Sequence, residues 1–169
     1  MAFGGSIVMR ANRKMKELLD ESSRAGNLRA QIALHDLHQL LFPPIHEIDG
    51  CIIIDGGRKE TICVSRLKYI EKHIEEYGKT LSEDAFNEVL VNACLVTRNR
   101  EALLKVGLMV VSVWSDMLGR RFPHLRFCIP MSYDGTNLIM RFFTIREGET
   151  SIYDLVESYD EAFMLVEVG

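Results

Sequence analysis

The sequence predicts a single α+β domain, in which about six helices pack on a small and mainly antiparallel sheet. The chain has 169 residues, a common size for one domain, and no linker, repeat or low-complexity segment divides it. Short β-branched runs alternate with longer segments whose hydrophobic residues recur every three or four positions. We therefore expect one domain over residues 1–169, with a flexible start at residues 1–8.

The N-terminal part of the chain predicts two helices. Hydrophobic residues recur among charged ones from about Ser6 to Arg24, and Gly26 follows as a C-terminal stop. Asn27 is suited to cap a second helix directly afterwards. Pro43 ends this second helix, because a proline disfavours helical backbone at the residue before it.

A hairpin and a helix are predicted next. Residues 51–55 and 60–64 form two short β-branched runs that flank a glycine turn, so we expect them to pair with each other. Leu67, Ile70 and Ile74 then fall on one side of a helix over residues 65–77.

Two further helices are expected before the last third of the chain. Thr80-Leu81-Ser82-Glu83 has the form of a capping box, which predicts a helix over about 81–93. The segment 100–118 is apolar on almost every side and follows Asn99 as N-cap. We interpret this segment as the central helix of the core.

The last third predicts a second hairpin and a C-terminal strand. A two-residue type I′ turn at Asp134-Gly135 joins the strands 125–132 and 138–145 and gives one wholly apolar face. It pairs Met131 with Leu138, Ile129 with Met140 and Phe127 with Phe142.

Pro130 then turns its missing N–H away from the hairpin partner, so strand 125–132 should be an edge strand. A short helix around 151–158 and a strand over 162–166 follow, and we expect this last strand to pair with residues 138–145.

Composition excludes several classes of protein. The chain has 24 acidic and 20 basic residues, a net charge of −4, which argues against binding nucleic acid through its whole surface. Four cysteines at 51, 63, 94 and 128 lack zinc-site spacing, and we interpret them as free thiols. The longest uncharged apolar run, 106–115, is too short for a membrane span. We therefore expect a soluble cytoplasmic protein.

Catalytic and metal-binding motifs are weak. His35 and His38 lie three positions apart and His46 follows, but the stronger helical zinc spacing is four positions with a glutamate between. A nuclease-like pair at Asp55 and Glu60 lacks its lysine, because Ile62 stands in that place. We expect no bound metal or cofactor and, on balance, no enzymatic activity.

Charge is unevenly distributed along the chain. Seven acidic residues and no basic one lie between 147 and 169. Such a stretch is often only a solvated face, but together with exposed tyrosines it also suits capture of a basic protein partner. We therefore expect a small non-catalytic binding module, of the inhibitor or immunity type. Its expected partner-binding residues are Glu149, Tyr153, Asp154, Glu157, Tyr159, Asp160 and Glu161.

An arginine-rich loop supports an alternative function. Arg120, Arg121, His124 and Arg126 surround Phe122 between the central helix and the next strand. Arginines interleaved with an aromatic residue suit an anionic or phosphorylated small molecule, or a nucleic acid. Cations are also common at the negative end of a helix dipole. The alternative is therefore a ligand-binding or enzymatic domain that uses this loop.

Overall fold

The computed structural model describes residues 7–24, 33–54, 64–95, 99–148 and 156–169. These residues form an α+β fold, as predicted, with five α-helices rather than about six. The elements are β1 (Ile7–Ala11), α1 (Arg13–Arg24), α2 (Leu34–Leu41), β2 (Ile45–Ile48), β3 (Cys51–Ile54), α3 (Val64–Tyr77), α4 (Lys79–Phe86), β4 (Val89–Leu90), the 3₁₀-helix η1 (Val91–Cys94), α5 (Arg100–Arg121), β5 (Phe127–Tyr133), β6 (Leu138–Met140), β7 (Phe143–Thr144), the 3₁₀-helix η2 (Val156–Ser158) and β8 (Ala162–Val168).

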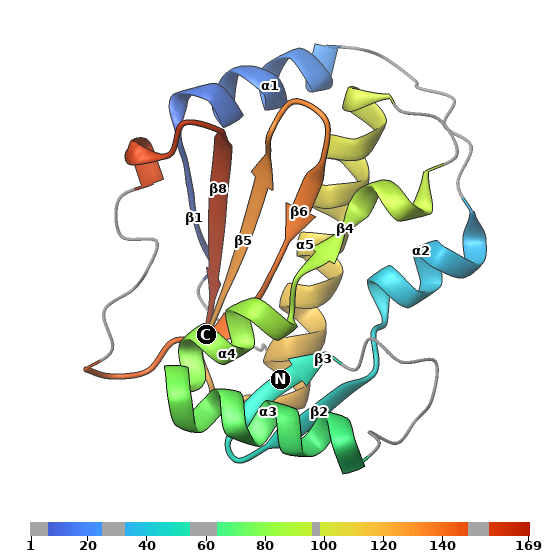
Figure 1. Ribbon diagram of the computed structural model, residues 1–169. Coiled ribbons are helices and arrows are strands. Elements are labelled where there is room, and N and C mark those ends of the chain that lie inside the picture. The colour runs from blue at the N-terminus through green and yellow to red at the C-terminus, as the bar shows by residue number, and fades with distance from the viewer. Residues whose placement is uncertain (1–6, 25–32, 55–63, 96–98, 149–155) are drawn as a thin grey trace.

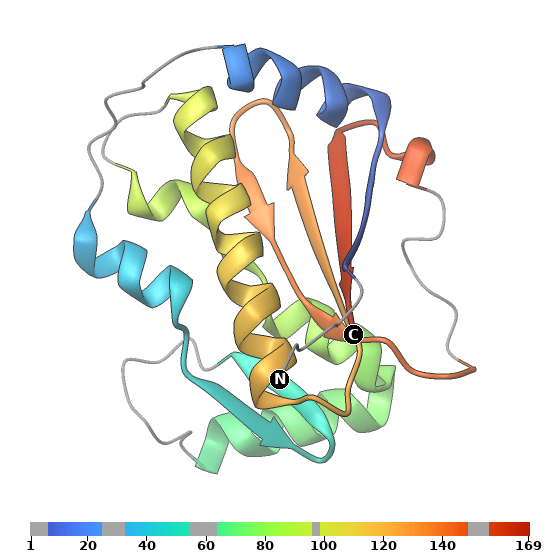
Figure 2. The same cartoon turned by 180° about the vertical axis from the view of Figure 1, so that it is seen from behind.

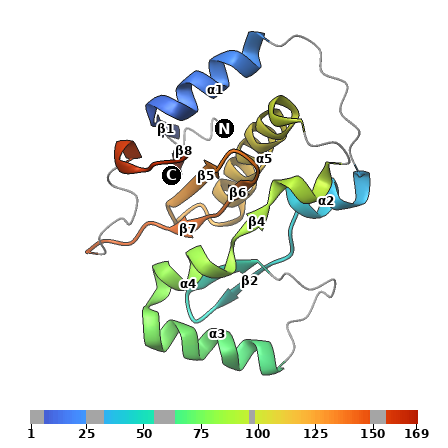
Figure 3. The same cartoon turned by 45° about the horizontal axis from the view of Figure 1, so that its top comes forward.

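Two antiparallel sheets organise the described chain. The larger one has six strands in the order β1-β8-β5-β6-β4, and β7 also pairs with β5. Helix α1 crosses one end of this sheet, and α5 runs along its rear face in Figure 1, which Figure 2 shows from behind. The smaller sheet consists of β2 and β3, and lies with α3 and α4 at the opposite end of the molecule from α1 (Figure 3).

The predicted N-terminal helix begins later than expected. Residues 7–11 form strand β1, which pairs with β8, so the prediction of helix from Ser6 is wrong for Ile7–Ala11. The helix starts only after Asn12, whose Oδ1 accepts a hydrogen bond from the N–H of Met15 at 2.9 Å. The strand forms because β8, contributed by the other end of the chain, supplies its hydrogen-bond partner. The second predicted helix also begins later, at Leu34, because Ala33 before it has extended backbone, so Asn27 does not cap it. Residues 1–6 and 25–32 lie outside the described residues.

The first hairpin uses a different pair of strands. Residues 51–54 pair with residues 45–48, so the predicted pairing of 51–55 with 60–64 is wrong over the part that the structure describes. Asp49 and Gly50 form the turn, with φ of 49° and 70°. Positive φ at both central residues is the signature of a type I′ turn. The Asp-Gly dipeptide in the sequence was therefore the signal for this hairpin.

The predicted helix over 81–93 is replaced by three shorter elements. Helix α4 spans Lys79–Phe86, and Gly78 rather than Thr80 precedes it without a side-chain cap. Residues 89–90 form β4, which pairs with β6, and η1 follows. The capping-box interpretation fails because Glu83 is wholly buried and bonds strands distant in sequence, as described below.

The second hairpin forms between the predicted segments, but its register is shifted by two residues. Tyr133 pairs with Leu138, and Met131 pairs with Met140 rather than with Leu138. Successive residues of a strand alternate between faces, so a shift of two leaves each side chain on its predicted face. The apolar face therefore still meets the core.

The shift arises in the turn. Its central residues are Gly135 and Thr136, because the N–H of Asp134 donates to the carbonyl oxygen of Asn137 at 3.3 Å. Gly135 has φ of 100° at the position where type II′ turns carry glycine. Asp134 Oδ1 also accepts the N–H groups of Thr136 and Asn137, both at 2.7 Å. Moving the turn centre by one residue moves the strand pairing by two.

Strand β5 lies inside the sheet, so its predicted place at an edge is wrong. Strand β8 pairs with β5 and β1, not with residues 138–145. The N–H of Arg141 donates to the carbonyl oxygen of Pro130 at 3.1 Å, and proline has no N–H to return that bond. The ladder is interrupted at this point, between β6 and β7.

Helix α5 confirms the predicted central helix. Asn99 caps it, accepting the N–H of Ala102 at 3.0 Å. Gly107 lets the helix approach the sheet, since a Cβ there would lie 2.6 Å from Leu138 Cδ2. By length and composition α5 could cross a membrane, but more than half of its most apolar stretch is buried inside the molecule. That burial is typical of the core helix of a soluble domain.

Candidate functional site

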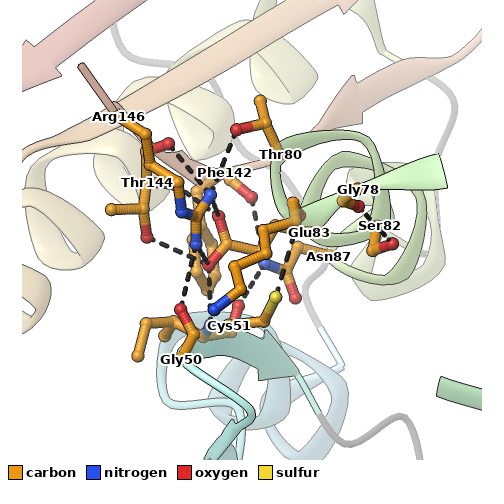
Figure 4. Close-up of polar contacts among 12 residues, drawn as sticks. Gly50, Cys51, Gly78, Thr80, Ser82, Glu83, Asn87, Phe142, Thr144 and Arg146 are labelled. Carbon is orange, nitrogen blue, oxygen red and sulfur yellow. Dashed lines mark hydrogen bonds and ion pairs between the residues drawn. The ribbon is translucent and has the colours of Figure 1, made fainter. Parts of the chain in front are cut away.

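Helix α4 joins the two sheets through a buried glutamate. Glu83 has no exposed surface, and its two oxygens accept hydrogen bonds from both sheets. Oε1 accepts the N–H of Ile52 in β3 at 2.7 Å, and Oε2 accepts the N–H of Thr144 in β7 at 2.6 Å (Figure 4). The side chain thus replaces the neighbouring strand that each of these N–H groups lacks.

Asn87, one helical turn later, repeats this arrangement. Its Oδ1 accepts the N–H of Ile54 at 2.7 Å, and its Nδ2 donates to the carbonyl oxygens of Ile52 and Phe142 at 2.7 and 2.9 Å. Residues four positions apart face the same way on a helix. One face of α4 therefore serves both strand edges, and we call Glu83, Asn87 and Arg146 the polar junction.

Arg146 neutralises the buried glutamate. Its Nη1 and Nη2 each lie 2.9 Å from a different Glu83 oxygen, a two-pronged ion pair. Its remaining contacts include Thr80 Oγ1 and the carbonyl oxygen of Gly50, both at 3.1 Å. Thr144 Oγ1 adds a further bond to Glu83 at 3.0 Å. With five donors on one carboxylate, its acceptor sites are used within the protein, so the junction holds the fold and offers no base for catalysis.

The buried nucleophiles near these elements are also engaged or protonated. Burial raises the pKa of Cys51 to about 11 and that of Cys128 to about 12, so both are thiols at neutral pH. Neither forms a disulfide, in agreement with the expected free thiols. Ser82 is wholly buried, lies 2.8 Å from His73 Nδ1 and donates to the carbonyl oxygen of Gly78.

The acidic C-terminal stretch lies near the start of α1. Glu157 and Asp160 are exposed, whereas Glu161 is half-buried. Glu157 accepts the N–H of Arg13 at 3.2 Å and lies 3.6 Å from Lys16 Nζ. The predicted site residues Glu149, Tyr153 and Asp154 lie outside the described residues.

Tyr159 is less exposed than expected. It is half-buried and its ring stacks on Phe163, with the centroids 4.2 Å apart and the planes at 10°. Burial is also the main cause that raises its pKa above the ordinary value. The tyrosine is therefore a fixed part of the surface rather than a projecting side chain.

Asp160 and Glu161 form part of an open pocket of about 430 Å³. Helix α1 contributes one wall, and the β5–β6 turn and the N-terminus of α5 contribute the others. These elements meet at the end of the sheet where α1 crosses it (Figure 1). Five carboxylates and two cationic side chains are among the lining residues, which are Lys14, Glu17, Leu18, Glu21, Arg100, Tyr133, Asp134, Gly135, Asp160, Glu161 and Ala162.

The charges of this acidic pocket are only partly balanced inside the protein. Arg100 Nη2 lies 2.9 Å from Glu21 Oε2, and Lys14 donates to the backbone oxygen of Asp160 rather than to its carboxylate. Hydrogen bonds from the backbone of Asn137 and then Thr136 lower the pKa of Asp134, which keeps it ionised at neutral pH. Within the described ranges, the carboxylates of Asp160 and Glu161 have no ion-pair partner.

The residues of the alternative site do not share one role in the structure. Arg120 Nε lies 2.7 Å from Asp116, and Arg121 Nη2 donates to the carbonyl oxygen of Ile45 at 2.8 Å. Arg126 Nη2 lies 3.5 Å from Glu167. His124 is exposed. Each of the three arginines is bound to its own neighbour, which is the arrangement expected when cations serve a helix end and a sheet edge.

His35 and His38 make separate contacts. His35 Nε2 lies 3.1 Å from Gln39 Nε2, and His38 packs against Phe42 with ring centroids 5.6 Å apart. In the part of the chain that the structure describes, no three His, Cys, Asp or Glu residues are grouped so that they could hold a metal ion. The absence of a metal in this protein stays a prediction.

Sequence reasoning missed the pocket residues outside the acidic stretch. Glu17 and Glu21 are four positions apart on α1, so they share a helical face, and this spacing was the available signal. Asp134 was identified only as a turn residue. Neither fact indicates that α1 and the turn lie beside Asp160, because that proximity depends on the sheet order.

Comparison with known proteins places nearly the whole chain in one family. Residues 10–169 match the model of a family described as Uncharacterized protein PM0498 family. The match takes in every described element from the end of β1 to β8, including the polar junction and the acidic pocket. Neither the curated proteins nor the solved structures compared with the chain match it.

Proposed function

The chain belongs to the uncharacterised PM0498 family, and we propose that it is a small non-catalytic binding module that engages a basic protein partner through the acidic pocket. The observation that carries this proposal is the excess of carboxylates around one open pocket, five against two cationic side chains. A lysine or arginine side chain of a partner matches the charge of such a site. We place the protein in the cytoplasm, acting as an inhibitor or immunity protein does, by covering its partner.

The pocket suits recognition better than catalysis. Asp160 and Asp134 are exposed at its rim, where water screens their charge, so they would steer and orient a cation rather than activate a reaction. Tyr133 lies at its inner side, almost buried, with its hydroxyl donating to the carbonyl oxygen of Gly135 at 2.7 Å. This bond gives the inner wall a fixed shape.

The surrounding surface extends the proposed interface. Glu157 and Tyr159 lie in the same C-terminal stretch as Asp160 and Glu161: Glu157 accepts the N–H of Arg13, and Tyr159 stacks on Phe163. Tyrosine provides contact area at low entropic cost, and its stacking on Phe163 lowers that cost further. An acidic rim beside a fixed aromatic ring is an arrangement that protein interfaces use. Glu149, Tyr153 and Asp154 remain expected members of this surface.

The experiment compares two sets of charge substitutions. The pocket variant is Asp160→Lys/Glu161→Lys, and its control is Glu71→Lys/Glu75→Lys, which changes two exposed acids of α3 at the far end of the molecule. Each protein is titrated with a fluorescent oligolysine peptide and then used to capture partners from a lysate. Net charge changes equally in both, so a pocket-specific loss reports on the site rather than on overall charge.

We expect the pocket variant to lose most of its peptide affinity and its captured partner, and the control to keep both. Binding by the unchanged protein should weaken steeply with salt, since the contacts are between exposed charges. Equal losses in the two variants would refute a localised site. The pocket variant could instead keep a protein partner that Arg120→Glu/Arg121→Glu/Arg126→Glu loses. That result would assign binding to the arginine loop.

A further inference from the structure

Strand β1 ends the larger sheet on one side. Its inner side pairs with β8, and among the described residues no strand lies on its outer side. Ile7 is 65% exposed and Met9 is 61% exposed. They pair with Val168 and Val166, which belong to the core cluster that α5 covers, so both side chains lie on the α5 face of the sheet. Val8 is also exposed, on the opposite face. Exposed apolar side chains along an unpaired strand are uncommon, because such edges attract other strands.

Alternate residues of β1 point their backbone N–H and C=O groups away from β8, toward solvent. The N–H of Asn12 donates to the carbonyl oxygen of Phe163 at 2.9 Å. Asn12 and Phe163 therefore form a hydrogen-bonded pair, in which the backbone groups of Asn12 point toward β8. Hydrogen-bonded and unbonded pairs alternate in an antiparallel ladder, so Arg10 and Val8 also bond inward. Ile7, Met9 and Ala11 then point their N–H and C=O groups away from β8.

We infer that β1 pairs with β1 of a second copy of this chain, antiparallel and centred on Met9, so that the two sheets become continuous. In this register Met9 faces its own counterpart, and Ile7 faces Ala11 of the partner. All three outward-directed residues of each strand therefore find a bonding partner. On the α5 face the large Ile7 meets the small Ala11 at each end of the pairing, and the two flexible Met9 side chains meet at its centre.

The other face of the strand also favours a second copy. Arg10 stands opposite Val8 of the partner in this register, so no like charges meet across the pair. Arg10 is already paired with Glu167 of its own chain, which partly offsets the charge that would otherwise protect the edge. A strand that is complementary to itself when reversed fits a two-fold dimer.

The dimer should be concentration-dependent. Two five-residue strands bury less than the roughly 1,200 Å² typical of a stable interface. Residues 7–9 precede the part of the chain that the family model matches, so the inference concerns this chain. It is independent of the acidic pocket, which lies beyond the other end of the strand.

The first test removes one outward N–H. Met9→Pro deletes a donor that points away from β8, so the internal ladder keeps all its bonds, and proline is tolerated at edges. We expect sedimentation velocity over a hundredfold concentration range to show a dimer of the unchanged protein at the upper end. Dimerisation of Met9→Pro should be at least roughly tenfold weaker, since two symmetry-related bonds are lost. A protein that stays monomeric throughout, or a proline variant that dimerises equally well, would overturn the inference.

The second test fixes the register. Facing residues of a hydrogen-bonded pair have Cα atoms about 5.5 Å apart, within the range that a disulfide spans. Met9→Cys should therefore form a dimeric disulfide on mild oxidation, much faster than Val8→Cys, whose counterpart lies two positions away. The unchanged protein controls for its native cysteines. Equal rates for the two variants would mean random collision and would contradict this register.

Discussion

The polar junction and the acidic pocket contain the same chemical group in opposite situations. Glu83 is wholly buried and accepts five hydrogen bonds, two of them from Arg146. Asp160 is exposed, and its carboxylate forms no ion pair among the described residues. Burial without partners would cost several kcal/mol, so the first charge survives only because it is fully satisfied. The second charge lies at the surface, where water can solvate it.

This contrast separates the carboxylate that holds the fold from the carboxylates for which we propose a binding role. A buried acid such as Glu83 is the more conspicuous of the two, but its acceptor sites are already used by hydrogen bonds within the protein. An exposed acid is individually unremarkable, and becomes informative when several line one pocket. The comparison therefore predicts that stability and binding depend on different acids.

The largest effect is expected for Glu83→Ala. It leaves Arg146 with a buried charge and the N–H groups of Ile52 and Thr144 without acceptors, so the free energy of unfolding should fall by about 3–5 kcal/mol. Urea denaturation measures this loss. Alkylation of Cys51, which borders the junction, should also accelerate and can be followed by peptide mapping. A loss below about 1 kcal/mol would mean that the junction is not the connection between the sheets.

Asn87→Ala should have the second largest effect. Its amide makes three buried hydrogen bonds to the backbone, and their loss should cost about 2–3 kcal/mol. Asn92 is a matched control, because its amide also makes hydrogen bonds to the backbone, at Thr136 and Leu138, but is half-buried. Asn92→Ala should cost less, since water can replace its bonds. Equal losses would show that burial does not set the cost.

Gly135→Val should have an intermediate effect and tests the wall of the pocket. A Cβ at Gly135 would meet nothing within 4 Å, so the cost comes from φ of 100° alone. A β-branched residue there should lower the melting temperature and cost about 1–3 kcal/mol. Gly135→Asn should be milder, because asparagine tolerates positive φ. An unchanged melting temperature for the valine variant would argue against the Gly135-Thr136 turn.

The smallest effect on stability is expected for Asp160→Asn/Glu161→Gln. Exposed carboxylates without ion pairs contribute little to folding, so the change should lie within about 0.5 kcal/mol. The same variant should bind the oligolysine probe more weakly. If thermal denaturation instead shows a large loss, these acids belong with Glu83, and the division between the two regions fails.

Local signals predicted the elements whose causes are local. Helix α3 and the central helix α5 followed from their hydrophobic spacing and, for α5, from the cap at Asn99. Alternation set the faces of β5 correctly even though its register was wrong. The α+β class followed from these elements together.

Long-range partners decided the remaining elements. Strand β1 was mistaken for helix because its pairing partner β8 lies at the other end of the chain. Glu83 fits a capping box by spacing, but its actual donors lie 31 and 61 positions away. In the candidate site, charge counting identified Asp160 and Glu161. Glu17 and Glu21 join them only because the sheet order brings α1 to the same end.

The way α4 joins the sheets also affects how the molecule opens. The amides of Ile52, Ile54 and Thr144 are bonded to side chains, not to a neighbouring strand. Their protection against hydrogen exchange therefore depends on α4 staying in place, even if both sheets remain intact. These three amides would exchange together when the smaller sheet separates from the larger one. Native-state exchange at these positions would measure the free energy of that separation directly.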